Sequence, residues 1–194
     1  MVSTDNGTTW NRTKFFDFPI DGYEPDDGLP EDPTVAEDFN GDGIAQEYLS
    51  TDGSGSVHID HNGVVHVAFG SMYYMDADTT DGGYSSFSTT NGLHYWNTNM
   101  AENGAHLIGQ APDLNANGVL DLDIIPTFNY NVGLASMPTF ASGEEEGLFL
   151  SFSAVTEGFI AFNGMNCRHQ FLIQSSDGGA TWNTDEPTDL TPDG

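Results

Sequence analysis

Residues 175–182 read Ser-Ser-Asp-Gly-Gly-Ala-Thr-Trp, and residues 3–10, at the other end of the chain, read Ser-Thr-Asp-Asn-Gly-Thr-Thr-Trp. Both octapeptides fit the pattern Ser-x-Asp-x-Gly-x-Thr-Trp. A worn copy at 88–95 keeps the Ser and the Gly, but has Thr90 in place of the Asp and a Tyr in place of the Trp. The third positions of the three copies are 85 and 87 residues apart. Such a constant period is typical of repeat proteins, in which each unit buries its apolar faces against its neighbours.

The residue types of the octapeptide predict a tight turn between two strands. Ser and Asp side chains hydrogen-bond to nearby backbone groups, and Gly supplies the positive φ that a tight turn requires. The closing Thr-Trp begins a strand with a large apolar side chain. We therefore expect each full copy to fasten a turn by its own side chains.

The octapeptide resembles the Asp box, or BNR repeat, of β-propellers such as sialidases and sortilin-type receptors. The resemblance implies an all-β fold built of propeller blades. In that family the Asp box lies on the rim, away from the catalytic centre, so the resemblance implies a structural role for the motif. It says little about function, because one fold can carry many activities.

The chain of 194 residues is too short to close a propeller, which needs at least about four blades of four strands. We expect a single partial propeller domain over 1–194, with about two four-stranded blades and long acidic loop insertions. The repeat units are predicted at about 11–97 and 98–183. The chain is accordingly expected to be a segment of a longer polypeptide.

The clearest hairpin in the first unit joins 56–60 to 64–69 through His61-Asn62-Gly63. A three-residue loop pairs His58 with His66 and Asp60 with Val64, and it places the alternating Val and Ile residues together on one face. A third strand is expected over 84–89. The worn octapeptide should turn it into a fourth strand that begins at 94–98.

In the second unit we expect strands over 133–140, 148–154 and 168–175, followed by the closing octapeptide. A long insertion over 101–130 precedes them. Short strands rich in Gly and aromatic residues, separated by turn signals, favour an all-β fold, and no segment is predicted to be helical.

The charge is strongly acidic, because 30 Asp and Glu residues face only Arg12, Lys14 and Arg168, for a net charge of −27. Such a surface repels phosphate backbones and anionic lipids, which argues against nucleic-acid partners and direct membrane insertion. It attracts cations. The single Cys167 allows no internal disulfide, which is compatible with a bacterial surface protein.

Two acidic, Gly-containing runs are candidate calcium loops. Residues 113–121 fit Asp-x-Asn-x-Asn-Gly-x-x-Asp, in which side-chain oxygens and one carbonyl can surround a hard cation while Gly makes the bend. The pattern resembles the short calcium loops of integrin-type and dockerin-like repeats. The run that starts at Asp38 begins in the same way, but its last carboxylate comes one place later. The alternative is that both runs are solvated turns.

The candidate ligands of the first loop are Asp38, Asn40, Asp42, the carbonyl of Ile44, and Glu47. Those of the second loop are Asp113, Asn115, Asn117, the carbonyl of Val119, and Asp121.

Two further groups of side chains have both a structural and a functional interpretation. His58, His66 and Asp60 share a face, where they could bind a transition metal, but packed and hydrogen-bonded imidazoles are the favoured interpretation. The aromatic residues in 72–75 and 95–96 could stack on sugars, although in propellers they more often fill the space between blades.

The resemblance to sialidases implies three arginines that hold the substrate carboxylate, a Tyr nucleophile beside a Glu, and an Asp as acid/base. The chain has two arginines, and Arg12 follows an Asp box on the outer side of a blade, so only Arg168 is a candidate. The segment cannot hold the arginine triad by itself. A pair of carboxylates acting as acid and base stays open at this point.

These observations predict a noncatalytic, calcium-stabilised propeller segment of a secreted or cell-surface bacterial protein, used for adhesion, recognition or scaffolding. Its expected partners are the remaining blades of the same polypeptide or a surface assembly, with glycans as candidate ligands. The alternative is part of an extracellular sialidase-like or other glycoside hydrolase, whose catalytic residues lie partly outside the segment. A third interpretation is a spacer in a large surface assembly.

Overall fold

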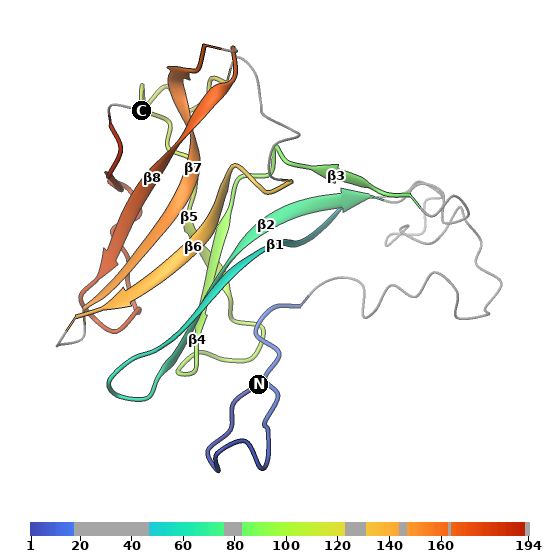
Figure 1. The fold of residues 1–194 in the computed structure, drawn as a ribbon, viewed down its shortest axis with the longest axis vertical. Coiled ribbons are helices and arrows are strands. Elements are labelled where there is room, and N and C mark those ends of the chain that lie inside the picture. The colour runs from blue at the N-terminus through green and yellow to red at the C-terminus, as the bar shows by residue number, and fades with distance from the viewer. Residues whose placement is uncertain (18–46, 76–82, 123–130, 144–146, 163, 193–194) are drawn as a thin grey trace.

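The computed structural model is built of β-strands, as predicted, and the residues that it describes contain no helix (Figure 1). It describes residues 1–17, 47–75, 83–122, 131–143, 147–162 and 164–192. A helix that is long and apolar enough to span a bilayer is not found among them.

The first sheet is antiparallel and follows the order β1-β2-β4-β5, with the short β3 also paired to β2. Its strands are β1 (Tyr48–Ile59), β2 (Val65–Met75), β3 (Ser85–Phe87), β4 (Leu93–Asn97) and β5 (His106–Gly109). The second sheet is a meander in the order β6-β7-β8-β9. Its strands are β6 (Ala135–Ser142), β7 (Leu148–Ile160), β8 (Asn166–Ser175) and β9 (Thr188–Asp189). Neither sheet closes on itself.

The predicted register of the β1–β2 hairpin is confirmed, since His58 pairs with His66. The structure adds which face is buried. Val57 and Ile59 point outward and are 67% and 62% exposed, whereas the side chain of His66 is fully buried between the sheets. The apolar face is therefore the outer one, because the inner face of the hairpin meets an aromatic cluster that includes Tyr95 and Phe140.

The prediction that the worn octapeptide turns the third strand into the fourth is wrong. Both β3 and β4 pair with β2 on the same side, through Tyr73↔Phe87 and Gly70↔Leu93. The residues between them form an interruption in one long strand. Thr90 at the position of the Asp donates a hydrogen bond to the carbonyl of Phe87 (2.7 Å) and accepts one from the backbone N–H of Tyr73 (2.8 Å). A threonine has a single side-chain oxygen, so it cannot make the paired bonds of a carboxylate.

The two sheets pack face to face and share one core. Figure 1 shows β6 of the second sheet beside β1 and β2 of the first, which it contacts. The buried apolar residues come from both sheets and from the segments next to them: Ala68, Leu93, Tyr95, Ile108, Ala111, Leu134, Ala135, Leu150, Phe152, Ala154, Val155, Phe171 and Ile173. Burial of this surface is the main stabilising contribution to the contact between the sheets.

The segment that follows the first octapeptide covers part of the outer face of the first sheet. Phe15 stacks on Trp96 with ring centroids 5.7 Å apart, and Phe16 meets Phe69 edge-on at 5.4 Å. The exposed Val57 and Ile59 lie on this outer face of the sheet as well. The outer face is therefore apolar and only partly covered within the described residues.

Candidate functional site

The two full octapeptides form the same turn. In the first, Ser3 Oγ donates to Asp5 Oδ1 (2.8 Å) and accepts from the N–H of Gly7 (2.8 Å), and Asp5 accepts from the N–H and the hydroxyl of Thr9 (2.8 and 2.7 Å). In the second, the equivalent distances are 2.7, 2.9, 2.9 and 2.6 Å. The prediction that each copy fastens a turn with its own side chains is confirmed.

These hydrogen bonds lower the pKa values of the two carboxyl groups. The hydroxyl and the N–H of Thr9, followed by Ser3, lower the pKa of Asp5 to about 2, and the equivalent bonds from Thr181 and Ser175 lower the pKa of Asp177 to about 2. Because the folded-state pKa is depressed, the stabilisation is present above the ordinary value of 3.8 and is lost as the pH falls toward 2. Both carboxylates are therefore ionised at neutral pH and able to accept these hydrogen bonds.

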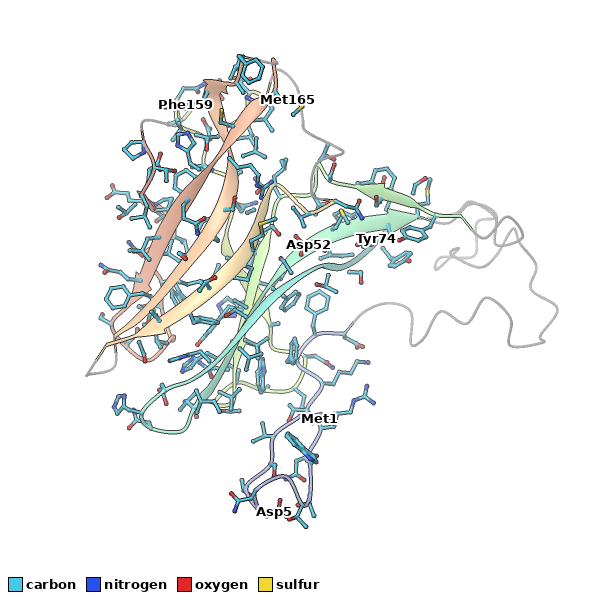
Figure 2. The ribbon with its side chains drawn as sticks, viewed as in Figure 1. Met1, Asp5, Asp52, Tyr74, Phe159 and Met165 are labelled. Carbon is cyan, nitrogen blue, oxygen red and sulfur yellow. The ribbon has the colours of Figure 1, made fainter. Side chains whose placement is uncertain are left out.

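The surroundings of the two turns differ. Trp182 of the second turn lies edge-on to Tyr95 of β4, with centroids 5.1 Å apart, and also contacts Phe140 of β6. Trp10 of the first turn is 59% exposed and donates only to the carbonyl of its own Gly7 (3.1 Å). Figure 2 shows Asp5 in a loop that projects away from both sheets. Among the described residues, the same turn is thus docked on a sheet in one place and largely exposed in the other.

A glycine of the second turn also belongs to this contact. A Cβ added at Gly179 would lie far inside van der Waals contact with Tyr95 Oη and 2.8 Å from Tyr95 Cζ. The equivalent Cβ at Gly7 would meet only Trp10 Cζ2, at 3.7 Å. Both glycines have a positive φ, of 88° and 83°. The second turn is therefore in close contact with the first sheet through a residue that has no side chain.

Tyr95 stands at the centre of a buried polar group. Its hydroxyl lies 2.8 Å from His66 Nδ1 and accepts a hydrogen bond from Asn97 Nδ2 at 2.8 Å. His66 Nε2 is 3.4 Å from Asp60 Oδ2. Burial raises the pKa of Tyr95 to about 12, so the phenol is neutral and inaccessible. The favoured interpretation of the histidine pair as packed side chains is confirmed for His66.

A second buried polar group joins β1 to β6 (Figure 2). Asp52 accepts hydrogen bonds from Ser136 Oγ (2.5 Å) and the N–H of Gly133 (3.1 Å) in the second unit, and from Ser54 of its own strand (2.7 Å). Both strands are irregular here, with register shifts between Thr51 and Gly55 and between Ser136 and Thr139. The sequence did not single out Asp52, because the two donors that tie it to the second sheet, Gly133 and Ser136, lie more than 80 residues away.

The second candidate calcium loop is folded back on itself. Asp113 Oδ2 accepts from the N–H of Gly118 (2.7 Å), and Asn117 Nδ2 donates to Asp121 (2.9 Å). Val119, whose carbonyl is a predicted ligand, donates its N–H to Asn117 Oδ1 (2.8 Å). The loop therefore brings Asp121 within hydrogen-bonding distance of the amides of Asn115 and Asn117, and holds Asp113 on the backbone of Gly118.

The structure adds a carboxylate that the sequence did not indicate. Glu157 at the far end of β7 is buried and accepts from the N–H of Leu114 (3.3 Å) and from Asn115 Nδ2. Its only signal in the sequence is an acidic residue near the end of the predicted strand, separated from Val155 by Thr156. Asp113 Oδ1 is buried and has no hydrogen bond.

The first candidate loop lies mostly outside the described residues, which exclude Asp38, Asn40, Asp42 and Ile44. Glu47 is described and borders an open groove of about 460 Å³ beside Leu49 and His94. In the described part of the chain, no three His, Cys, Asp or Glu side chains are placed so that they could hold a metal ion.

The arginines do not converge. Arg168 donates to Ser153 Oγ (3.1 Å), to the carbonyl of Ser153 (2.9 Å) and to the carbonyl of Gly133 (3.2 Å). These bonds hold its guanidinium on the backbone of neighbouring strands. Arg12 is exposed beside the first turn.

A groove of about 450 Å³ adjoins the second loop and is lined in part by Asp113, Asp185 and Leu107.

Comparison of the chain with protein-family models, with curated proteins and with solved structures gives no match. The geometry of the chain alone therefore supports the functional argument.

Proposed function

We propose that the chain is a noncatalytic, calcium-stabilised segment of a β-propeller in a secreted or cell-surface bacterial protein, and that it serves adhesion, recognition or scaffolding. Its partners are further blades of the same polypeptide or a surface assembly. The observation that carries the proposal is the pair of identical turns, of which only one is docked on a neighbouring sheet.

The contact of the second turn with the first sheet indicates the contact that the first turn would make with a further unit. Trp182 is partly buried and packs against the aromatic rings of Tyr95 and Phe140 beside the core that the two sheets share. Trp10 has the same turn geometry but remains largely in solvent. In a repeat protein each unit covers its neighbour, so a further unit on the side of the first turn accounts for the exposed Trp10, Val57 and Ile59.

The noncatalytic character rests on the side chains that a sialidase-like mechanism would use. Arg168 is bonded to backbone carbonyls, and Tyr95 is buried with a raised pKa. We therefore expect fluorogenic sialosides to remain uncleaved, with no measurable binding of sialic acid in a calorimetric titration. Turnover that disappears in Arg168→Ala would overturn this part of the proposal and favour the glycoside hydrolase.

The calcium part rests on the second loop. A hard cation prefers oxygen ligands, and the loop offers carboxylates at Asp113 and Asp121 and amide oxygens at Asn115 and Asn117. The bond from the N–H of Gly118 to Asp113 Oδ2 leaves Oδ1 buried without a partner. A buried, unpaired carboxylate oxygen is costly, and a bound cation would satisfy it. Glu157 lies next to this loop, where it accepts hydrogen bonds from the N–H of Leu114 and from Asn115 Nδ2.

We expect millimolar calcium to raise the Tm. Binding to the folded state alone stabilises by about 2.7 kcal/mol when free calcium is a hundredfold above its Kd, which corresponds to a rise of roughly 5–10 °C in a chain of this size. Calorimetry with calcium, with a chelator, and with sodium chloride at matched ionic strength measures the increment. Magnesium should substitute poorly, since it demands a stricter octahedral geometry.

Variants locate the calcium. Asp113→Ala and Asp121→Ala should each remove much of the calcium-dependent increment, and Asp38→Ala should remove a separate part. Glu102→Ala, which changes the charge equally at an exposed position outside both the loop and its groove, should leave the increment intact. The calcium-dependent increment in Tm is compared, and not the Tm itself, because Asp113→Ala also loses the hydrogen bond from the N–H of Gly118. If calcium and sodium chloride raise the Tm equally, and Asp113→Ala responds to calcium as the parent does, both loops are plain solvated turns.

A further inference from the structure

Unpaired imidazole nitrogens are frequent in the interior of this protein. Four of the six histidines have a buried ring nitrogen without a hydrogen bond: His58 Nε2, His66 Nε2, His94 Nδ1 and His169 Nε2. A protonated imidazole carries an N–H on both ring nitrogens, and each of them then needs an acceptor. In His66 the nitrogen without a hydrogen bond is Nε2, and Nδ1 faces a hydroxyl.

His66 is the one that lies at the contact between the sheets. Its side chain is fully buried, and its ring stacks on Tyr95 and meets Phe140 of the second sheet, with centroids 6.0 and 6.2 Å away. Its Nδ1 is 2.8 Å from Tyr95 Oη. Its Nε2 is 3.4 Å from Asp60 Oδ2 but is not aligned for a hydrogen bond.

The second octapeptide turn rests on the partner of His66. Tyr95 is the residue against which Gly179 and Trp182 pack. Its hydroxyl accepts a hydrogen bond from Asn97, so its own proton is free to be donated to Nδ1 of a neutral His66. This row of bonds fixes the position of the phenol that the second turn meets.

Protonation of His66 would disturb this row. Both ring nitrogens would then donate, so the Tyr95 hydroxyl could no longer donate to Nδ1 and would need another acceptor. The new charge would also lie among aromatic rings. Burial already lowers the pKa of His66 below 6.5, although Asp60 opposes the shift.

The charged and titratable groups around His66 come from every neighbouring element. His58 lies on β1, with ring centroids 6.3 Å apart, Asp60 on the β1–β2 turn, and Tyr95 on β4. From the second sheet, the charge of Asp177 acts on Tyr95. Asp60 already accepts two backbone hydrogen bonds through Oδ1, from Asn62 and Val64, so only its misaligned Oδ2 faces the ring.

We propose that His66 is a pH-sensitive latch between the two sheets: the neutral imidazole positions Tyr95 for the second octapeptide turn, and its protonation releases that turn from the first sheet. The device goes beyond the proposed calcium-stabilised scaffold, because it makes the docking of one unit on the next depend on mild acid. The sign follows from the lowered pKa. Stability is complete above pH 6.5 and falls as the pH drops from 6.5 toward the folded-state pKa.

The test compares the 194-residue chain with His66→Asn and His61→Asn between pH 8 and pH 5. Asn at position 66 can still bond to Tyr95 but does not titrate, and His61 is an exposed histidine of the same hairpin. We expect the urea midpoint of the parent to fall below pH 6.5, the fall to be reduced by about half in His66→Asn, and His61→Asn to behave like the parent. An equal fall in His66→Asn would overturn the proposal.

Two further measurements keep the test decisive if His66→Asn does not fold. In the parent chain, a titration by nuclear magnetic resonance should give His66 a pKa below 6.5, and a pKa of 6.5 or higher would refute the latch. In a Trp10→Phe background, near-ultraviolet circular dichroism and tryptophan fluorescence should change with acid before the far-ultraviolet signal of the strands is lost. Simultaneous loss of all signals would show global unfolding instead of release of the turn.

Discussion

Gly179→Ala is expected to lower the free energy of unfolding by about 3 kcal/mol or more. Two costs add at this position. The positive φ of 88° disfavours any residue with a Cβ, by about 1–2 kcal/mol. The new methyl group also overlaps the hydroxyl end of Tyr95, and overpacking of this kind costs typically 1–3 kcal/mol. Urea denaturation monitored by circular dichroism measures the loss.

The first turn contains the matched control. Gly7→Ala carries the same backbone strain at a φ of 83°, but its Cβ would make only an ordinary contact with Trp10. We expect it to cost about 1 kcal/mol. The difference between the two variants isolates the contact with Tyr95. Equal losses at Gly7 and Gly179 would mean that the second turn is not docked on β4 in solution.

Trp182→Ala is expected to destabilise the protein by about 3 kcal/mol, because it removes an aromatic side chain that packs against Tyr95 and Phe140 at the core. Trp10→Ala, in a motif with the same Ser, Asp and Thr hydrogen bonds, should cost less than about 0.5 kcal/mol, since Trp10 is mainly exposed. Calorimetric unfolding of the two variants beside the parent gives both values.

The tryptophan pair also tests the proposed partner. A further unit that covers the first turn should raise the cost of Trp10→Ala toward that of Trp182→Ala when the longer polypeptide is measured. A large cost of Trp10→Ala in the 194-residue chain alone would contradict the undocked first turn. The exposed Val57 and Ile59 lead to the same expectation, because an open apolar sheet face promotes association of the isolated segment.

Local sequence was sufficient for the turns, the strand content and one register. The octapeptides form their own hydrogen bonds within seven residues, so Asp5 and Asp177 behave alike in very different surroundings. The His58–His66 register follows from the length of the hairpin loop and the alternation of its strands. These features depend on neighbours in the chain, which is why sequence patterns predict them.

The tertiary structure alone decided which faces are buried and which distant residues meet. Alternation showed that the histidines and the valines lie on opposite faces of the β1–β2 hairpin, but only the packing of the second sheet buried His66 and left Val57 exposed. The worn octapeptide matched by spacing, yet β3 and β4 on either side of it both pair with β2, so it only interrupts one long strand. Gly179 meets Tyr95, and Asp52 meets Ser136, across more than 80 residues. Such contacts arise when two sheets bury a common core, and no local pattern encodes them.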